Sequence, residues 1–185
     1  MFDNHTSIKV YPNHSNRTPT MENESNRRHV FISHHHQDDA AVDKLTRLLS
    51  RKGYDIRNSS IRAKPANQAR LDKGLVSDEV IRRLLRLKIA WAQTVVVLIG
   101  KETHTRPWVD WEIAEAHRRG KRIIGVYEHG GTSADQPANL RKYASNVVGW
   151  NAEGVLAAID GCDDPFQNPD GSEAPPSAVS VHVIC

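Results

Sequence analysis

The stretch TVVVLIGKETHTRPWVDWEIAEAHRRGKRIIGVY, residues 94–127, decides the fold. It begins with an apolar, largely β-branched run, which is typical of a strand covered on both faces. Pro107 suits the first turn of a helix and Gly120 suits its end, so a helix is predicted between them. A second apolar run begins at residue 122. A buried strand, a helix and another buried strand predict two parallel strands joined by a helical crossover.

The same alternation extends along the middle of the chain. Five strands are predicted, near residues 29–33, 54–57, 94–99, 122–126 and 147–149. Helices with an apolar face or clear end signals separate the first four of them, and a last helix follows the fifth. In the helix capped by Ser77, five residues recur at helical spacing: Val80, Ile81, Leu84, Leu85 and Lys88. The pattern predicts an α/β domain with a parallel five-stranded sheet in the common order 2-1-3-4-5.

Composition divides the chain into three parts. Residues 1–28 are rich in Asn, Ser, Thr and His without a periodic apolar pattern, so they are predicted to be a flexible arm. Residues 29–160 form the predicted domain. Residues 161–185 are rich in Pro, Asp and Ser and are predicted to be a tail, in which the alternating sequence AVSVHVI fits a short strand.

Charge and cysteine content argue against several classes of protein. The formal net charge is +3, but the basic residues form no dense block and no aromatic residues are interleaved with them, which argues against nucleic-acid binding. Cys162 and Cys185 make neither a disulfide framework nor a zinc pattern, which favours a reducing, cytoplasmic location. We expect no secretion signal and no membrane segment, because the N-terminus lacks an apolar core and the run TVVVLIG is too short to span a bilayer.

Polar residues gather where a sheet of this order binds ligands. Ligands lie outside the carboxyl ends of the strands, at the point where the strand order reverses, which here falls between the first and third strands. The first strand ends at Ser33 and the third at Gly100. The segments SHHHQDD and GKETHTRPW that begin at these residues are therefore expected to face one crevice.

A metal site is the first interpretation of the histidine run. His34, His35 and His36 are adjacent, so their side chains diverge, whereas zinc ligands usually lie one helical turn or a short loop apart. No HExxH motif and no cysteine pair completes a ligand set. We expect no bound metal, and at most one of these histidines turned into the pocket.

A phosphate-accepting site, as in receiver domains, is the second interpretation. Asp38 and Asp39 fit an acidic pair after the first strand, but the third strand ends LIGKETH, without the aspartate that such a site needs. The two aspartates are more simply the negative first turn of a helix.

A site for a cationic, ring-bearing molecule is the third interpretation. Trp108 and Glu112 lie four residues apart, on one face of a helix whose N-terminus meets the crevice. An indole can stack on a cationic ring, and a carboxylate can accept hydroxyl hydrogen bonds or stabilise positive charge. In the alternative, structural interpretation, a tryptophan anchors the helix to the sheet and Glu112 is only an early-turn charge. Spacing alone leaves both open.

Three segments together resemble a TIR domain, in particular the TIR-like proteins of the bacterial Thoeris anti-phage system: HVFISHHHQDD, TVVVLIGKETHTRPWVDWEIAEA and GKRIIGVY. The resemblance covers roughly residues 29–160 and implies a flavodoxin-like three-layer sandwich. Enzymatic members of the family cleave the nicotinamide–ribose bond of NAD⁺, and Glu112 matches their catalytic glutamate. The nucleotide pocket that the resemblance implies is expected to include Ser33, His34, His35, Asp38, Gly100 and Trp108.

The resemblance also implies partners. In Thoeris, the TIR protein makes a cyclic or conjugated ADP-ribose signal, which a separate effector protein reads. NAD⁺ would be the substrate, with no resident cofactor or metal. TIR domains also self-associate, and some act as adaptors and lack the glutamate. A non-catalytic adaptor is therefore the alternative, and the presence of Glu112 favours catalysis.

Overall fold

A five-stranded sheet forms the centre of the computed structural model, which describes residues 28–35, 39–58, 77–162 and 166–174. The strand order is β2-β1-β3-β4-β5, and every neighbouring pair is parallel. The strands are β1 (His29–Ser33), β2 (Asp55–Asn58), β3 (Thr94–Ile99), β4 (Arg122–Tyr127) and β5 (Asn146–Val148). The predicted α/β fold and strand order are confirmed, and each strand end lies within one residue of its predicted position.

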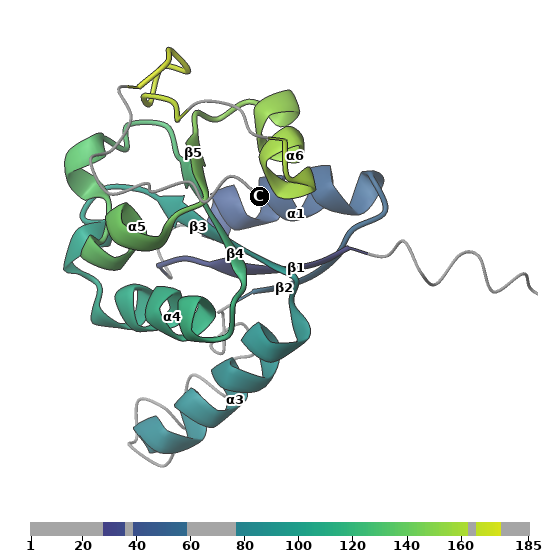
Figure 1. Ribbon diagram of the computed structural model, residues 1–185, viewed down its shortest axis with the longest axis vertical. Helices are drawn as coiled ribbons and strands as arrows, with labels where there is room; N and C mark the ends of the chain where they lie inside the picture. Colours follow the sequence, from purple (N-terminus) through teal and green to yellow (C-terminus); the bar gives the residue numbers. More distant parts are fainter. Residues whose placement is uncertain (1–27, 36–38, 59–76, 163–165, 175–185) are drawn as a thin grey trace, which may run out of the picture.

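Helices cover both faces of the sheet and make three layers (Figure 1). One face packs against α1 (Asp39–Arg51) and α6 (Ala152–Asp160). The other packs against α3 (Asp78–Trp91), α4 (Pro107–Arg118) and α5 (Ala138–Tyr143). Along β1, side chains alternate between the two cores: Val30 and Ile32 face the first, and Phe31 faces the second. Within the described residues, no helix is long and apolar enough to cross a membrane.

Local signals explain where these helices begin and end. The side chains of Ser77 and Asn151 accept backbone N–H groups at the starts of α3 and α6, and Pro107 is the first residue of α4. Gly161 ends α6 with a φ of 90°, in the left-handed region that glycine adopts without strain. The short helix α5 was not predicted, because six residues are too few to show a helical period.

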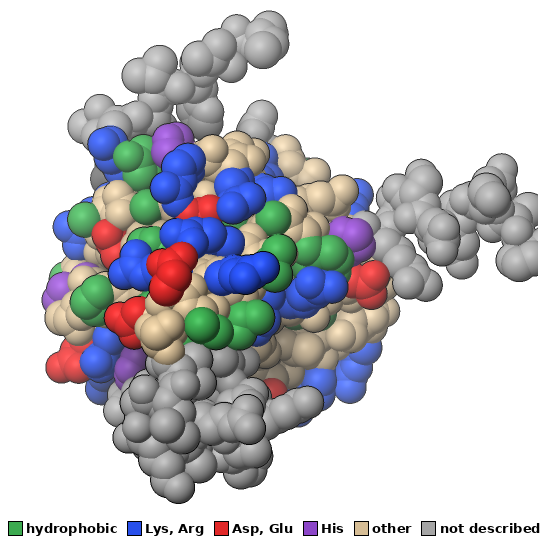
Figure 2. All heavy atoms as spheres, turned by 90° about the horizontal axis from the view of Figure 1, so that it is seen from below, with side chains coloured by type: hydrophobic (Ala, Val, Ile, Leu, Met, Phe, Trp, Pro, Cys, Tyr) green, Lys and Arg blue, Asp and Glu red, His purple; other side chains and the backbone are tan. Residues whose placement is uncertain are grey.

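The apolar face predicted for α3 is only partly buried. Leu85 reaches the core, as does Ile89, which lies one turn further on. In contrast, Val80 and Leu84 are 49% and 44% exposed, which corrects the prediction for the first half of this face. The reason is geometric: α3 extends away from the sheet at its start (Figure 1), and Val80 and Leu84 lie on a different side of the helix from the residues that contact the core, which are Ile81, Leu85 and Ile89. Figure 2 shows the molecule from below the view of Figure 1, and on this face hydrophobic side chains lie among those of lysine and arginine.

Part of the predicted C-terminal tail packs on the sheet. Gln167 donates its backbone N–H to the carbonyl of Val147 in β5, and its side chain accepts the N–H of Gly149. Phe166 packs against the core of the α3–α4 face. The arm at residues 1–27 and the predicted short strand AVSVHVI lie outside the described residues.

Candidate active site

A buried hydrogen bond joins the end of the first strand to the helix after the third strand. Ser33 is the last residue of β1, and strand alternation turns its side chain to the same face as Phe31, towards α4. Its Oγ donates to Oε2 of Glu112, 79 residues further along the chain. Ser33 is fully buried and Glu112 is 2% exposed. This contact places a carboxyl group beside the carboxyl end of β1, where α/β sheets bind ligands.

Burial dominates the electrostatics of this carboxyl group. It raises the pKa of Glu112 to about 8, although the hydrogen bond from Ser33 and the positive charge of Lys88 both act to lower it. At neutral pH the site therefore favours the protonated carboxyl group. A cation brought next to it favours the carboxylate instead. A buried carboxyl group with such a pKa is a candidate functional group, and here it lies at the sheet end that binds ligands.

Lys88 contributes a second charged group to this region. It lies on α3 and donates its Nζ to the carbonyl of Asn58, at the end of β2, over 2.8 Å. Burial lowers the pKa of its ammonium group, with Glu112 acting to raise it and Arg57 to lower it. The predicted helical spacing of α3 includes Lys88, but no role was predicted for this residue. Lys88 is the one charged residue among the five at helical spacing, and this was the signal that could have drawn attention to it.

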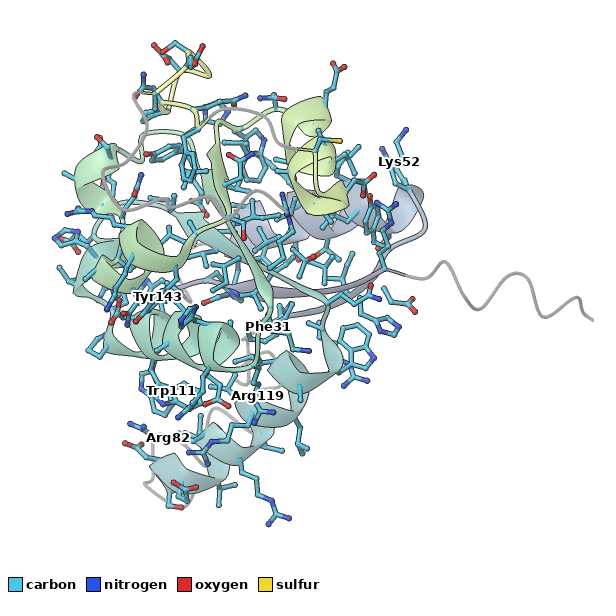
Figure 3. All side chains as sticks on the ribbon, in the orientation of Figure 1. Phe31, Lys52, Arg82, Trp111, Arg119 and Tyr143 are labelled. Carbon is cyan, nitrogen blue, oxygen red and sulfur yellow. The ribbon has the colours of Figure 1, made fainter. Side chains whose placement is uncertain are left out.

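The two tryptophans of α4 connect that helix to α3. The rings of Trp108 and Trp111 meet edge to face, with centroids 5.9 Å apart. The guanidinium group of Arg82 on α3 lies over both rings, at 5.3 Å and 5.2 Å from their centroids. Figure 3 shows Arg82 and Trp111 side by side between the helices. Both rings also pack against the core. Each tryptophan therefore helps to anchor α4 to the sheet, which is the structural role that the sequence had allowed for one tryptophan.

Comparison with known proteins shows the family of the chain. Residues 31–133, more than half of the chain, match the family model described as "Thoeris protein ThsB, TIR-like domain". The chain belongs to this family. The matched range of the TIR-like domain contains both Ser33 and Glu112.

The individual proteins that the chain resembles have low sequence identity to it. A protein of Bacillus cereus (strain MSX-D12), named "Putative cyclic ADP-D-ribose synthase ThsB1", is 27% identical over 119 residues, which are 64% of this chain and 60% of that protein. Among solved structures, the Clostridium botulinum CMP N-glycosidase BcmB is 17% identical with a TM-score of 0.46, over 72% of this chain and 98% of that one. The TIR domains of the activated Roq1 resistosome are 16% identical with a TM-score of 0.41, over 74% and 81%.

The histidines after β1 lie in different surroundings within the TIR-like domain. His34 is buried, with Nδ1 3.4 Å from the carbonyl of Ile32 and Nε2 3.4 Å from Oδ1 of Asp39 in α1. Its ring is thus directed to the start of α1. His35 is half-buried. His36 and Asp38 lie outside the described residues. In the part of the chain that the structure describes, no group of three His, Cys, Asp or Glu residues could hold a metal ion.

Thr103 and Asp135, which were not among the predicted site residues, organise the loop after β3. Gly100 is buried, and its N–H and carbonyl each lie 2.9 Å from Oγ1 of the fully buried Thr103. Glu102 has a φ of 61°, which is unusual for a residue with a side chain, and its N–H donates to Oδ1 of Asp135 over 2.8 Å. Asp135 also accepts the N–H and hydroxyl of Thr132. One carboxylate therefore joins the loops that follow β3 and β4.

Proposed function

We propose that this TIR-like domain is an NAD⁺-cleaving enzyme of a Thoeris defence system. In this proposal it breaks the nicotinamide–ribose bond and makes a cyclic or conjugated ADP-ribose signal for a separate effector protein. The observation that carries the proposal is the buried Glu112 carboxyl group, held by Ser33 at the ligand-binding end of the sheet. Membership of the Thoeris family and the name of the B. cereus relative support the same activity.

The positive charge of NAD⁺ would favour the ionised form of Glu112. The nicotinamide ring of NAD⁺ is positively charged, and a cation beside a buried carboxyl group favours its ionised form. Substrate binding would therefore displace the proton from Glu112, whose pKa is about 8 without substrate. Ser33 holds Oε2, which leaves Oε1 to accept hydrogen bonds from the ribose hydroxyl groups.

Bond cleavage then follows from these charges. The bond between C1′ of the ribose and the ring nitrogen breaks, and its electron pair moves to the nicotinamide ring, which leaves as a neutral molecule. The ribose acquires oxocarbenium character, as in glycoside cleavage, and the Glu112 carboxylate stabilises it. The cation is captured by a nucleophile, which loses its proton if it is water or a hydroxyl group. Water yields ADP-ribose, and the adenine or a ribose hydroxyl of the same molecule yields a cyclic product.

An adaptor that acts by self-association is the second candidate. The exposed side chains of Val80, Leu84 and Leu87 on α3 favour it, because they offer apolar surface for a contact between copies. In this alternative Glu112 has no catalytic work, so its replacement leaves defence intact. Both candidates allow the TIR-like domain to assemble, and only the enzyme consumes NAD⁺.

The discriminating experiment compares wild type with Glu112→Gln in cells that also express the effector protein. Nucleotides are extracted before and after phage infection and analysed by mass spectrometry, and phage survival is counted in parallel. We expect the variant to lose the NAD⁺-derived signal by about a hundredfold or more, because one preorganised electrostatic contact commonly contributes that much to a rate. Glu153→Gln, which removes an exposed carboxylate from α6, is the matched control. Unchanged nucleotide pools and unchanged protection in the Glu112 variant would establish the adaptor.

A further inference from the structure

Lys88 is a charged residue on the face of α3 that packs towards the sheet. Its neighbours Leu85 and Ile89 on that face are buried in the core. The aliphatic part of a lysine can pack in such a place while its ammonium group reaches a polar partner. Here the partner is the carbonyl oxygen of Asn58, 2.8 Å from Nζ. The side chain thus runs along the apolar face and ends at the carboxyl end of β2.

The anchor point lies next to the candidate active site. Asn58 pairs with Ile32 in the β1–β2 register, and the residue after Ile32 is Ser33, which holds Glu112. The ammonium group is therefore fixed one strand away from the serine that contacts the carboxyl group. The two charges interact, since Lys88 acts to lower the pKa of Glu112 and Glu112 acts to raise that of Lys88.

Other charged groups around this pair are engaged elsewhere or oppose it. On α4, Glu115 forms ion pairs with Arg118 and Arg119. On α3, the guanidinium of Arg82 lies over the two tryptophans. On β2, Arg57 repels Lys88 and lies over the ring of Trp91, 4.1 Å from its centroid. Ser33 of β1 is uncharged and supplies a hydrogen bond.

We propose that Lys88 is a positioning residue for NAD⁺ cleavage: its ammonium group, anchored on the end of β2, holds Glu112 as the carboxylate that stabilises the ribose cation. This inference rests on the proposed function. Desolvation favours a protonated Glu112, and two positive charges oppose it, the nicotinamide ring of the substrate and the ammonium group of Lys88. Lys88 is in place before the substrate arrives, so it reduces the cost of releasing the proton on binding.

The test is the pH dependence of single-turnover NAD⁺ cleavage between pH 6 and 9. Lys88→Met removes the charge and keeps an unbranched side chain, whereas Lys88→Arg keeps the charge. Lys121→Met is a matched control, because the Nζ of Lys121 also donates to a backbone carbonyl, that of Ala90, over 2.9 Å, but lies beside the start of β4, at the opposite end of the sheet.

We expect the rate of the Lys88→Met variant to rise with pH along a limb displaced to higher pH. Below the pKa that controls the rate, each unit by which this pKa is raised lowers the rate tenfold. Above it the carboxyl group is ionised in both proteins, so the ratio of variant rate to wild-type rate should approach one as pH increases. Lys88→Arg should restore the wild-type profile, and Lys121→Met should follow it. A loss of rate by the same factor at every pH, or an unmoved profile, would overturn the inference and leave Lys88 a structural residue.

A second readout does not need turnover. The ¹³C signal of the Glu112 carboxyl group, assigned by its loss in Glu112→Gln, is titrated in the unliganded wild type and Lys88→Met proteins. The variant should titrate at higher pH, and coincident curves would contradict the inference. If Lys88→Met does not fold, Lys88→Gln takes its place in both experiments. Failure of the proposed function is recognised separately, by a wild type that cleaves no NAD⁺ or by a Glu112→Gln variant as active as wild type.

Discussion

Replacing Glu112 by Gln should stabilise the protein, and the gain should depend on pH. The pKa of Glu112 is about 8 in the native protein, against 4.5 for an ordinary glutamate. A carboxyl group with a raised pKa binds its proton more tightly in the folded than in the unfolded chain. Its favourable contribution is therefore complete below pH 4.5 and is lost as pH rises through 8. Gln resembles the protonated carboxyl group in size and retains an oxygen that accepts the Ser33 hydroxyl, but it does not ionise.

The magnitude follows from the pKa difference. Within the window the wild-type native state loses about 1.4 kcal/mol for each pH unit, and the whole window amounts to about 5 kcal/mol. Relative to its value at pH 4, the difference in free energy of unfolding between variant and wild type should be about 1 kcal/mol at pH 5, about 3 kcal/mol at pH 7 and about 5 kcal/mol at pH 9. The buried carboxyl group thus lowers native stability at neutral and alkaline pH.

Urea unfolding followed by circular dichroism at these pH values measures the difference directly. Glu153→Gln is again the control, because it removes a carboxylate that is exposed on α6. A difference between the Glu112 variant and wild type that stays constant from pH 5 to pH 9 would refute the reasoning. It would mean that Glu112 is solvated in solution and that its burial does not control its ionisation.

Three further predictions concern the same site and its support. Ser33→Ala removes a hydrogen bond that lowers the pKa of Glu112, so NAD⁺ cleavage should fall at pH 7 and recover partly at pH 9; equal losses at both values would contradict this. NAD⁺ binding should release a proton at pH 7, measurable by calorimetry in buffers of different ionisation enthalpy, and neither NADH, whose ring is neutral, nor Glu112→Gln should show the release. Gly131→Ala would place a Cβ 2.1 Å from the carbonyl oxygen of Ile99, so urea unfolding should show a loss of stability, and an unchanged free energy of unfolding would contradict this.

Local sequence determined the strands and the main helices, and the strand order was predicted from the common arrangement of such sheets. Apolar runs such as residues 94–99 predict buried strands because both faces of a parallel sheet are covered. Ser77, Pro107 and Asn151 predict helix starts because they satisfy or avoid unpaired N–H groups within a few residues. The candidate residues Ser33 and Glu112 followed from the strand-end rule, helical spacing and the family resemblance, all of which can be recognised along the chain.

Only the tertiary structure decided the state of those residues. Spacing allowed Glu112 to be an ordinary early-turn charge, and its raised pKa depends on the β1 end, α3 and α4 closing around it. The apolar periodicity of α3 includes both Leu84 and Leu85, yet Leu84 is exposed and Leu85 is buried, because adjacent side chains of a helix point about 100° apart and only that of Leu85 faces the sheet. Lys88 acquired its place from the end of β2, 30 residues earlier in the chain. Periodicity and end signals are properties of neighbouring residues, whereas burial and charge coupling depend on segments that only folding brings together.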